Sequence, residues 1–402
     1  MSRLTRFPLW RLLLALCLFV VAFAIAACGD DDGGEEGEIV FGAAVAETGL
    51  LNFTDVPGLA AAETAVDNIN AEGGIDGREV RLISADTKSD RKLAPQVALE
   101  LIDEGAEVLL VTCDFDFGAP AALAAQDEGV LSMSLCAGEP RFGPEGIGEL
   151  AFSAGVATNG EGAAGAQFAT DDLDAKTAYL LEDPTLVYDQ YWVAAFEDGF
   201  NELGGEVLGK DTFENSDPSI ATQITRIRGL DEEPDVIGMC SYPPGGASAV
   251  KQIRAAGIDA PIVGCVAIDG DYWVNAVPNL SDFYTTAYGS VNGDDENERA
   301  NEILADVKAA GDAPATSHYL EGYTSVEILA EAISEADTTN AEELATTLES
   351  FEGVDVTLGE ITFNETYHVP QDREVAINEI VDGKSTYVTR LRPEVTPEPR
   401  TE

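Results

Sequence analysis

The chain has few cationic side chains. It contains 22 Lys and Arg residues against 74 Asp and Glu residues, which gives a formal net charge of -52. Proteins bind nucleic acids largely through cationic contacts to the phosphates. This charge balance therefore excludes a nucleic-acid partner, although it says nothing about the fold.

Histidine is scarcer still, because only His318 and His368 occur in 402 residues. They lie in separate late segments. The sequence therefore offers few histidines that could act as the base of a Ser/His/Asp or Cys/His catalytic arrangement. The sequence also lacks an HExxH motif, a CxxC pair and a phosphate-binding P-loop. The acidic stretch 293–298 lacks the spacing of a calcium loop. We therefore expect no enzymatic activity, no cofactor and no metal site.

The N-terminal 27 residues have the pattern of a secretion signal. Three arginines precede an apolar run from Leu12 to Ala27, which is shorter than the roughly 20 residues of a membrane span. A transmembrane anchor is the alternative. The small residues directly before Cys28 resemble a bacterial lipobox, which implies cleavage there and acylation of the cysteine. Residues 28–38 carry no apolar side chain after the cysteine and predict a flexible acidic tether. We expect an extracytoplasmic protein that is lipid-anchored to the outer face of the cell membrane.

Four cysteines remain outside the signal and the proposed lipid site. Cys113 and Cys136 each end an apolar run, and Cys240 and Cys265 end two further runs in the same way. If each pair of runs forms neighbouring parallel strands, the cysteines meet at matching strand ends. An oxidising compartment favours disulfides, so we predict bridges 113–136 and 240–265. Free buried thiols are the alternative.

From residue 39 the sequence alternates between short strand-like runs and helix-like segments that end in glycine. The alternation restarts at 177–182 with a similar layout. Such a pattern predicts two α/β lobes, each with a doubly wound parallel sheet. A ligand binds beyond the carboxyl ends of the strands in open α/β sheets. Two lobes that face each other would therefore share one ligand cleft. Residues 393–402 are rich in Pro and Glu and predict a disordered tail.

Three segments resemble the Leu/Ile/Val-binding protein family, which has the type I periplasmic binding protein fold. They are DNINAEGGIDGREVRLISAD at 67–86, DEGVLSMS at 127–134 and SYPPGGASAVKQIRAAGIDAPIVG at 241–264. The similarity extends over most of the chain from Ile39 to about Arg390. It implies an extracytoplasmic solute-binding lipoprotein of an ABC importer, whose two lobes close over a small polar solute such as an amino acid, amide, amine or polyol.

The resemblance also implies partners and lobe boundaries. The partners are the solute, an ABC permease and the membrane through Cys28, and the protein is expected to act as a monomer. We expect residues 39–157 and 290–353 to form the first lobe, and residues 158–289 and 354–392 to form the second. A ligand-presenting sensor lipoprotein on the same fold is the alternative.

The family's binding positions carry over unevenly. Phe53, Tyr188 and Tyr242 match aromatic residues of the cleft. The family's acidic partner for a ligand ammonium corresponds most nearly to Asp269. After the third and fourth strands the family places small hydroxyl and backbone groups that hold an amino acid's carboxylate. Those positions are occupied here by Cys113, Asp114, Phe115, Asp116 and Phe117, and by Cys136, Ala137, Gly138 and Glu139.

The acidic loop at residues 114–117 departs from the family's pattern, and it can be interpreted in two ways. An ionised side chain would repel a ligand carboxylate at this place, so the loop favours a cationic, amide or hydroxyl-bearing ligand. Alternation along the loop would direct Asp114 and Asp116 one way, and Phe115 and Phe117 the other. The structural reading is that one acid, Asp116 by position, caps the following helix. Branched-chain amino acids remain the family's usual ligands.

Overall fold

The computed structural model describes residues 37–400. The predicted signal, the lipid site Cys28 and nearly all of the tether lie outside these residues. Residues from Glu38 onward form one compact unit. In the part of the chain that is described, no helix is both long and apolar enough to cross a membrane.

The first lobe is built on a five-stranded parallel sheet with the order β2-β1-β3-β4-β5. The middle strand β3 is buried along its whole length, as expected for a parallel strand covered on both faces. The strands are β1 (Ile39–Val45), β2 (Val80–Asp86), β3 (Val108–Val111), β4 (Leu131–Ser134) and β5 (Ala151–Ser153). The helices are α2 (Asn52–Ala71), α3 (Ala94–Asp103), α4 (Phe115–Glu128), α9 (Glu298–Ala310), α10 (Tyr319–Ala336) and α11 (Ala341–Glu349).

The second lobe contains a seven-stranded sheet with the order β14-β13-β10-β9-β8-β6-β7. Its strands from β6 to β10 pair in parallel, and β13 and β14 add an antiparallel edge. The strands are β6 (Thr177–Glu182), β7 (Glu206–Thr212), β8 (Val236–Cys240), β9 (Ile262–Gly264), β10 (Phe283–Ala287), β13 (Val375–Val381) and β14 (Lys384–Leu391). The helices are α5 (Thr158–Asp171), α6 (Val187–Glu202), α7 (Ala221–Ile227) and α8 (Gly245–Ala255), with short 3-10 turns η1 (Val266–Ile268) and η2 (Val274–Ala276).

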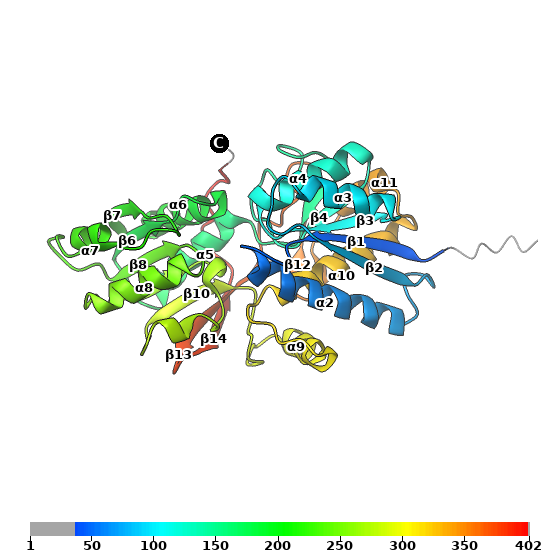
Figure 1. The fold of residues 1–402 in the computed structure, drawn as a ribbon. Coiled ribbons are helices and arrows are strands. Elements are labelled where there is room, and N and C mark those ends of the chain that lie inside the picture. The colour runs from blue at the N-terminus through cyan, green and yellow to red at the C-terminus, as the bar shows by residue number, and fades with distance from the viewer. Residues whose placement is uncertain (1–36, 401–402) are drawn as a thin grey trace, which may run out of the picture. The chain divides into compact units, whose positions relative to one another are not determined.

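The two lobes lie side by side (Figure 1), as the restart of the alternation predicted. The chain crosses between them three times, after β5, after β10 and before β13. The predicted α/β class with two parallel-sheet lobes is confirmed.

One lobe boundary differs from the prediction. Strands β11 (Val354–Val356) and β12 (Gly359–Ile361) form a small hairpin, and Val356, Ile361 and Phe363 belong to the same hydrophobic core as β1, β3 and β4. The Thr357 N–H, in the turn of this hairpin, also donates a hydrogen bond to Glu327 of α10 over 2.9 Å. The hairpin therefore packs on the first lobe, whereas the prediction placed it in the second. A three-residue strand carries no sequence signal for the sheet on which it packs.

The tail predicted to be disordered makes specific contacts as far as residue 400. It has no regular secondary structure, but Asn159 donates a hydrogen bond to the Pro397 carbonyl over 2.9 Å, and Arg400 pairs with Asp198 over 2.8 Å. Its composition suggested disorder because few apolar side chains are available for burial. Polar contacts to α5 and α6 hold this segment instead.

The structure contains both predicted disulfides, Cys113–Cys136 and Cys240–Cys265. Their formation follows from strand register. In the first lobe β3 and β4 are neighbours, and each cysteine lies two residues beyond a matched pair of strand residues. In the second lobe each cysteine directly follows a matched pair in β8 and β9. The sulfur atoms therefore meet at the carboxyl ends of the strands.

Candidate functional site

A small cavity of about 30 Å³ lies between the two lobes at the carboxyl ends of the strands. The first lobe contributes the segments that follow β1, β3 and β4 and the residue before α10. The second lobe contributes the start of α6 and the segments after β9 and β10. The lining residues are Leu51, Phe53, Thr54, Cys113, Asp114, Cys136, Ala137, Gly138, Glu139, Leu186, Tyr188, Val266, Ala267, Tyr288 and His318.

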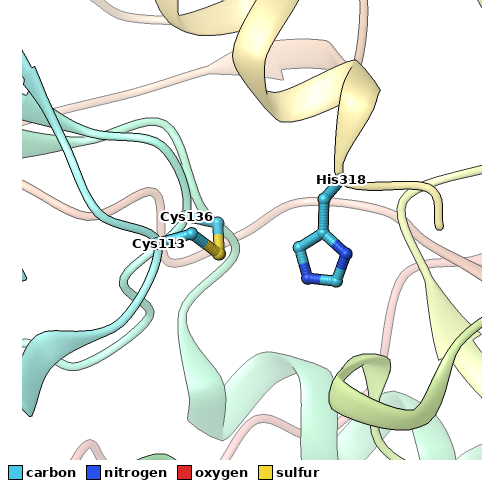
Figure 2. A group of neighbouring side chains, drawn as sticks. All are labelled: Cys113, Cys136 and His318. Carbon is cyan, nitrogen blue, oxygen red and sulfur yellow. A yellow bond between two sulfur atoms is a disulfide. The ribbon is translucent and has the colours of Figure 1, made fainter. Parts of the chain in front are cut away.

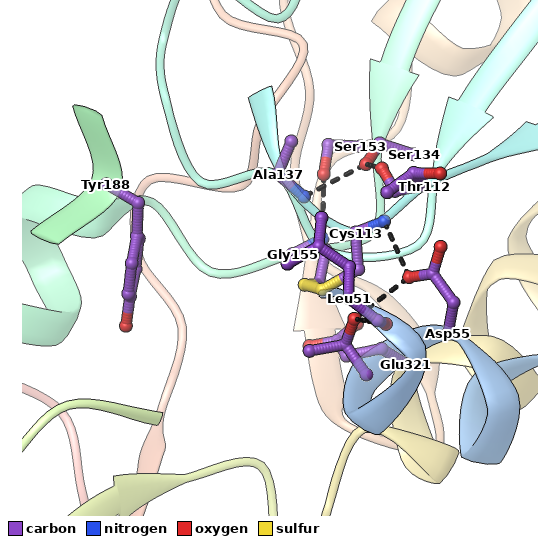
Figure 3. Close-up of a disulfide and its surroundings, with 12 residues drawn as sticks. Leu51, Asp55, Thr112, Cys113, Ser134, Ala137, Ser153, Gly155, Tyr188 and Glu321 are labelled. Carbon is purple, nitrogen blue, oxygen red and sulfur yellow. Dashed lines mark hydrogen bonds between the residues drawn. A yellow bond between two sulfur atoms is a disulfide. The ribbon is translucent and has the colours of Figure 1, made fainter. Parts of the chain in front are cut away.

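Local hydrogen bonds fix the first-lobe loops around the cavity (Figure 3). The buried Asp55 accepts hydrogen bonds from the backbone N–H of Ala46, over 2.7 Å, and from that of Cys113, over 3.0 Å. The Ser134 hydroxyl accepts from the Ala137 N–H and donates to the Thr112 carbonyl. The ends of β1, β3 and β4 are therefore tied together, which gives the cavity a firm wall.

The Cys113–Cys136 disulfide forms part of that wall, and His318 lies opposite it (Figure 2). Because both sulfur atoms are bonded to each other, this group offers no thiolate to a metal. The His318 ring lies edge-on to Phe53 and to Tyr288. Burial lowers the pKa of His318 to about 3, so its imidazole is neutral at physiological pH.

Asp114 lines the cavity and also caps α4, because its side chain accepts a hydrogen bond from the Phe117 N–H over 3.1 Å. The prediction that Asp116 is the cap was wrong by two residues. Asp116 instead accepts a hydrogen bond from the Val187 N–H in the second lobe and pairs with Arg91 over 3.7 Å. The acidic loop thus supplies one cavity residue and one contact between the lobes.

The predicted alternation of this loop fails because α4 begins at Phe115. Phe115 lies edge-on to Phe142, with the Arg141 guanidinium 4.5 Å above its ring. The Arg91 guanidinium lies over the Phe117 ring, also 4.5 Å from the ring centre. Both phenylalanine rings lie outside the cavity lining.

Glu139 is a cavity residue that sequence reasoning did not select. Its side chain is buried, with 1% of its surface exposed, and neither carboxylate oxygen has a hydrogen bond to another residue. Burial, together with the nearby charges of Asp116 and Glu161, raises the pKa of Glu139 to about 7, although its own backbone and Arg141 oppose the shift. Such a buried and unpaired acid is rare unless it has a function.

Tyr188 faces the disulfide from the second lobe (Figure 3). Its hydroxyl donates to Glu161 at 2.8 to 2.9 Å from the two carboxylate oxygens. Glu161 also accepts from the Val266 N–H, over 3.1 Å, and from the Thr286 hydroxyl. Burial raises the pKa of Glu161, while these hydrogen bonds oppose the shift. Glu161 therefore positions one aromatic wall of the cavity.

Besides Phe115, Asp116 and Phe117, two further predicted ligand residues lie outside the lining. Tyr242 is only 3% exposed and packs in the second-lobe core. Asp269 is buried and accepts hydrogen bonds from the Ser317 N–H, over 2.8 Å, and from the Asn378 side chain, over 3.4 Å. Both positions follow strands, but their side chains serve the protein's own structure. The predicted Phe53, Ala137, Gly138 and Tyr188 do line the cavity.

Ten of the fifteen lining residues were not predicted as ligand positions, among them the polar or aromatic Glu139, Tyr288 and His318. Glu139 directly follows the predicted Gly138, and Tyr288 directly follows β10, so strand ends could have indicated both. His318 follows no strand, and its role depends on a tertiary contact that no local pattern reveals.

The sequence profile of the family described as Periplasmic binding protein matches residues 38–384. The chain belongs to this family. A Leu/Ile/Val-binding protein, BraC3, from Rhizobium johnstonii is 24% identical over 308 residues, which cover 76% of this chain and 82% of that protein. The Leu/Ile/Val-binding protein of Escherichia coli is 23% identical over 329 residues, covering 80% and 83%.

Solved structures show that the fold is shared as well. One is the branched-chain amino acid transporter substrate binding protein LivJ from Streptococcus pneumoniae, in complex with isoleucine, with a TM-score of 0.77, 23% identity and coverage of 89% of this chain and 100% of that chain. Another is an R. palustris solute binding protein in complex with benzoate, with a TM-score of 0.72, 19% identity and coverage of 90% and 99%. The resemblance to the Leu/Ile/Val-binding protein family and the type I fold is confirmed. This periplasmic binding protein is a solute-binding protein and not an enzyme.

Proposed function

We propose that this protein captures a small polar solute in the cavity between its lobes and delivers it to an ABC permease. The observation that carries the proposal is the composition of the cavity wall, to which both lobes contribute at the carboxyl ends of their strands. A solute in this place contacts Phe53 and Gly138 of the first lobe and Tyr188 and Tyr288 of the second.

Binding is coupled to closure of the lobes. A ligand stabilises the conformation in which it gains more contacts, and only the closed arrangement encloses it from both sides. The bond between Asp116 and the Val187 N–H spans the lobes in this arrangement. The permease would then recognise the rims of both lobes together, which distinguishes the loaded protein from the empty one.

A thermal-shift screen of the chain from Glu38 tests the proposal, because a ligand that binds only the folded state raises its melting temperature. The screen contains amino acids, amides and urea, amines, carboxylic acids, and polyols. A hit should lose about tenfold or more in affinity in both Phe53→Ala and Tyr188→Ala, since each removes an aromatic wall of the cavity. Tyr272→Ala is the control, because Tyr272 is an exposed aromatic outside the lining. A hit that neither wall variant weakens, or one that is turned over, would refute capture in this cavity.

We further propose that Cys28 carries the lipid anchor on the outer face of the membrane. The lipobox-like residues before it and the acidic tether after it support this assignment. In a bacterial host that acylates lipoproteins, the full chain should incorporate labelled palmitate and sediment with membranes. Cys28→Ser should abolish labelling, and Cys17→Ser should not. Equal labelling of the Cys28→Ser chain would disprove the anchor.

A further inference from the structure

Carboxyl groups gather at one end of the cavity. Asp114 and Glu139 both line it, and Glu161 lies directly behind Tyr188. Asp189 is fully buried nearby, close enough that the charges of Asp114, Glu139 and Glu161 all raise its pKa. No Lys or Arg is among the described residues that line the cavity.

The nearest cationic side chains are directed elsewhere. Arg91 pairs with Asp116 and covers the ring of Phe117. Arg141 covers the ring of Phe115. Arg91 and Arg141 weakly favour the ionised forms of Asp114 and Glu139, but burial and the neighbouring acids outweigh them, so that the pKa values of both carboxyls are raised. The cavity is therefore lined by two acids that no cationic side chain of the lining faces.

Glu139 is the best placed of these acids to receive a ligand. Asp114 already accepts the hydrogen bond that caps α4, and Glu161 already accepts bonds from three residues. Glu139 has both oxygens buried without a hydrogen bond to another residue. A buried carboxylate is stabilised only if a partner of opposite charge or a set of donors reaches it.

Aromatic and apolar groups complete the cavity. Phe53, Tyr188, Tyr288, Leu186 and Val266 line the same cavity as the two acids. Aromatic faces attract organic cations and also accommodate an apolar body. The wall thus suits a small molecule that has a positively charged head and a short hydrocarbon part.

We propose that the cavity selects an organic cation without a carboxylate, such as a primary amine, whose charged head pairs with Glu139 and Asp114. This inference rests on the proposed function and specifies its ligand class. This ligand class differs from that of the relatives named as Leu/Ile/Val-binding proteins. The carboxylate of an amino acid would lie against Glu139 and Asp114, and these acids would repel it.

A different protonation state of the two acids predicts the opposite pH dependence of ligand binding. If Glu139 and Asp114 were protonated, they could donate hydrogen bonds to a carboxylate solute, and such binding would weaken as the pH rises. A cation requires ionised Glu139, so its binding strengthens as the pH rises through about 7. The charged or titratable groups that interact with these two acids are Asp116, Glu161, Asp189, Arg91, Arg141, Tyr242 and Tyr288. His318 stays neutral throughout this range.

Isothermal titration calorimetry of the chain from Glu38 tests the inference with ligands that share an isobutyl group. Isopentylamine is a cation, isovaleramide is neutral, isovalerate is an anion and leucine is a zwitterion. Choline and its uncharged isostere 3,3-dimethylbutanol form a second set. We expect at least one cation to bind at least about tenfold more tightly than its neutral isostere. Its affinity should increase about tenfold from pH 6 to pH 8, as the ionised fraction of Glu139 rises.

Variants locate the charge contact. Glu139→Gln should weaken cation binding about 100-fold, as loss of a buried charge partner does. Glu145→Gln is the matched control, because Glu145 is an exposed acid of the same loop, and it should bind as the native chain does. Failure of every cation to bind, tighter binding of isovalerate or leucine, or unchanged cation affinity in Glu139→Gln would overturn the ligand class. Those results would not refute the proposed capture of a solute. That proposal is refuted if neither Phe53→Ala nor Tyr188→Ala weakens the binding of a hit, or if a hit is turned over.

Discussion

Glu139→Gln should stabilise the solute-free protein by about 3 kcal/mol at pH 8, although the same change weakens binding of a cation. Burial raises the pKa of Glu139 from its ordinary value of 4.5 to about 7. A carboxyl whose pKa is raised by folding contributes its stability below pH 4.5, and this contribution is lost as the pH rises through 7. At ~1.4 kcal/mol per pKa unit, the ionised side chain costs about 3 kcal/mol above that pH. Glutamine removes this cost.

Urea unfolding at pH 5 and pH 8 measures the effect. The native chain should lose more unfolding free energy between these two pH values than Glu139→Gln does. The difference between the proteins is the quantity of interest, because other buried acids, such as Asp114 and Asp189, also make the native chain less stable at high pH. Glu145→Gln should follow the native chain. If Glu139→Gln unfolds at the same or a lower urea concentration at pH 8, Glu139 is not an unpaired buried acid.

At pH 9, Arg373→Met should destabilise the protein by about 3 to 5 kcal/mol, the usual result of removing one partner of a buried ion pair. Arg373 is 2% exposed and lies in the segment that crosses between the lobes before β13. Its guanidinium donates to the carbonyls of Ala154 and Leu358. It also lies 3.9 Å from Glu321, whose carboxylate is fully buried and has no hydrogen-bond donor.

The pH dependence and a second variant identify the cause. Burial raises the pKa of Glu321 to about 8 even though Arg373 opposes the shift. The loss in Arg373→Met should therefore be larger at pH 9, where Glu321 is ionised, than at pH 6. Adding Glu321→Gln should recover part of the stability at pH 9, because no buried charge then lacks its partner. A loss that is equal at both pH values and unaffected by Glu321→Gln would show that only the carbonyl contacts matter.

Much of the fold could be predicted because its signals are local. Strand-like runs and helical segments alternate along the chain, and such periodicity depends only on neighbouring residues. The disulfides followed from the same pattern, since each cysteine occupies an equivalent place after its strand. The hairpin at 354–361 was misplaced because three-residue strands pack wherever a core accepts them, and Val356 and Ile361 fit the first-lobe core.

The site was less predictable because its members depend on side-chain direction. Phe53, Asp114 and Tyr188 follow strands and line the cavity, whereas Tyr242 also follows a strand and packs in the core. The sequence marks where a strand ends, but it does not determine which way the next side chains turn. Glu139 was missed for a further reason: an acid without a partner is recognised only when all of its neighbours are known.

The central claim is that a small solute binds between the two lobes. A crystal structure of the chain from Glu38 with the tightest ligand from the thermal-shift screen tests this claim most directly. We predict one solute molecule enclosed by Phe53, Gly138 and Tyr188, with its polar head against Glu139. A solute bound on the outer surface of one lobe, with the cavity between the lobes empty, would contradict the account.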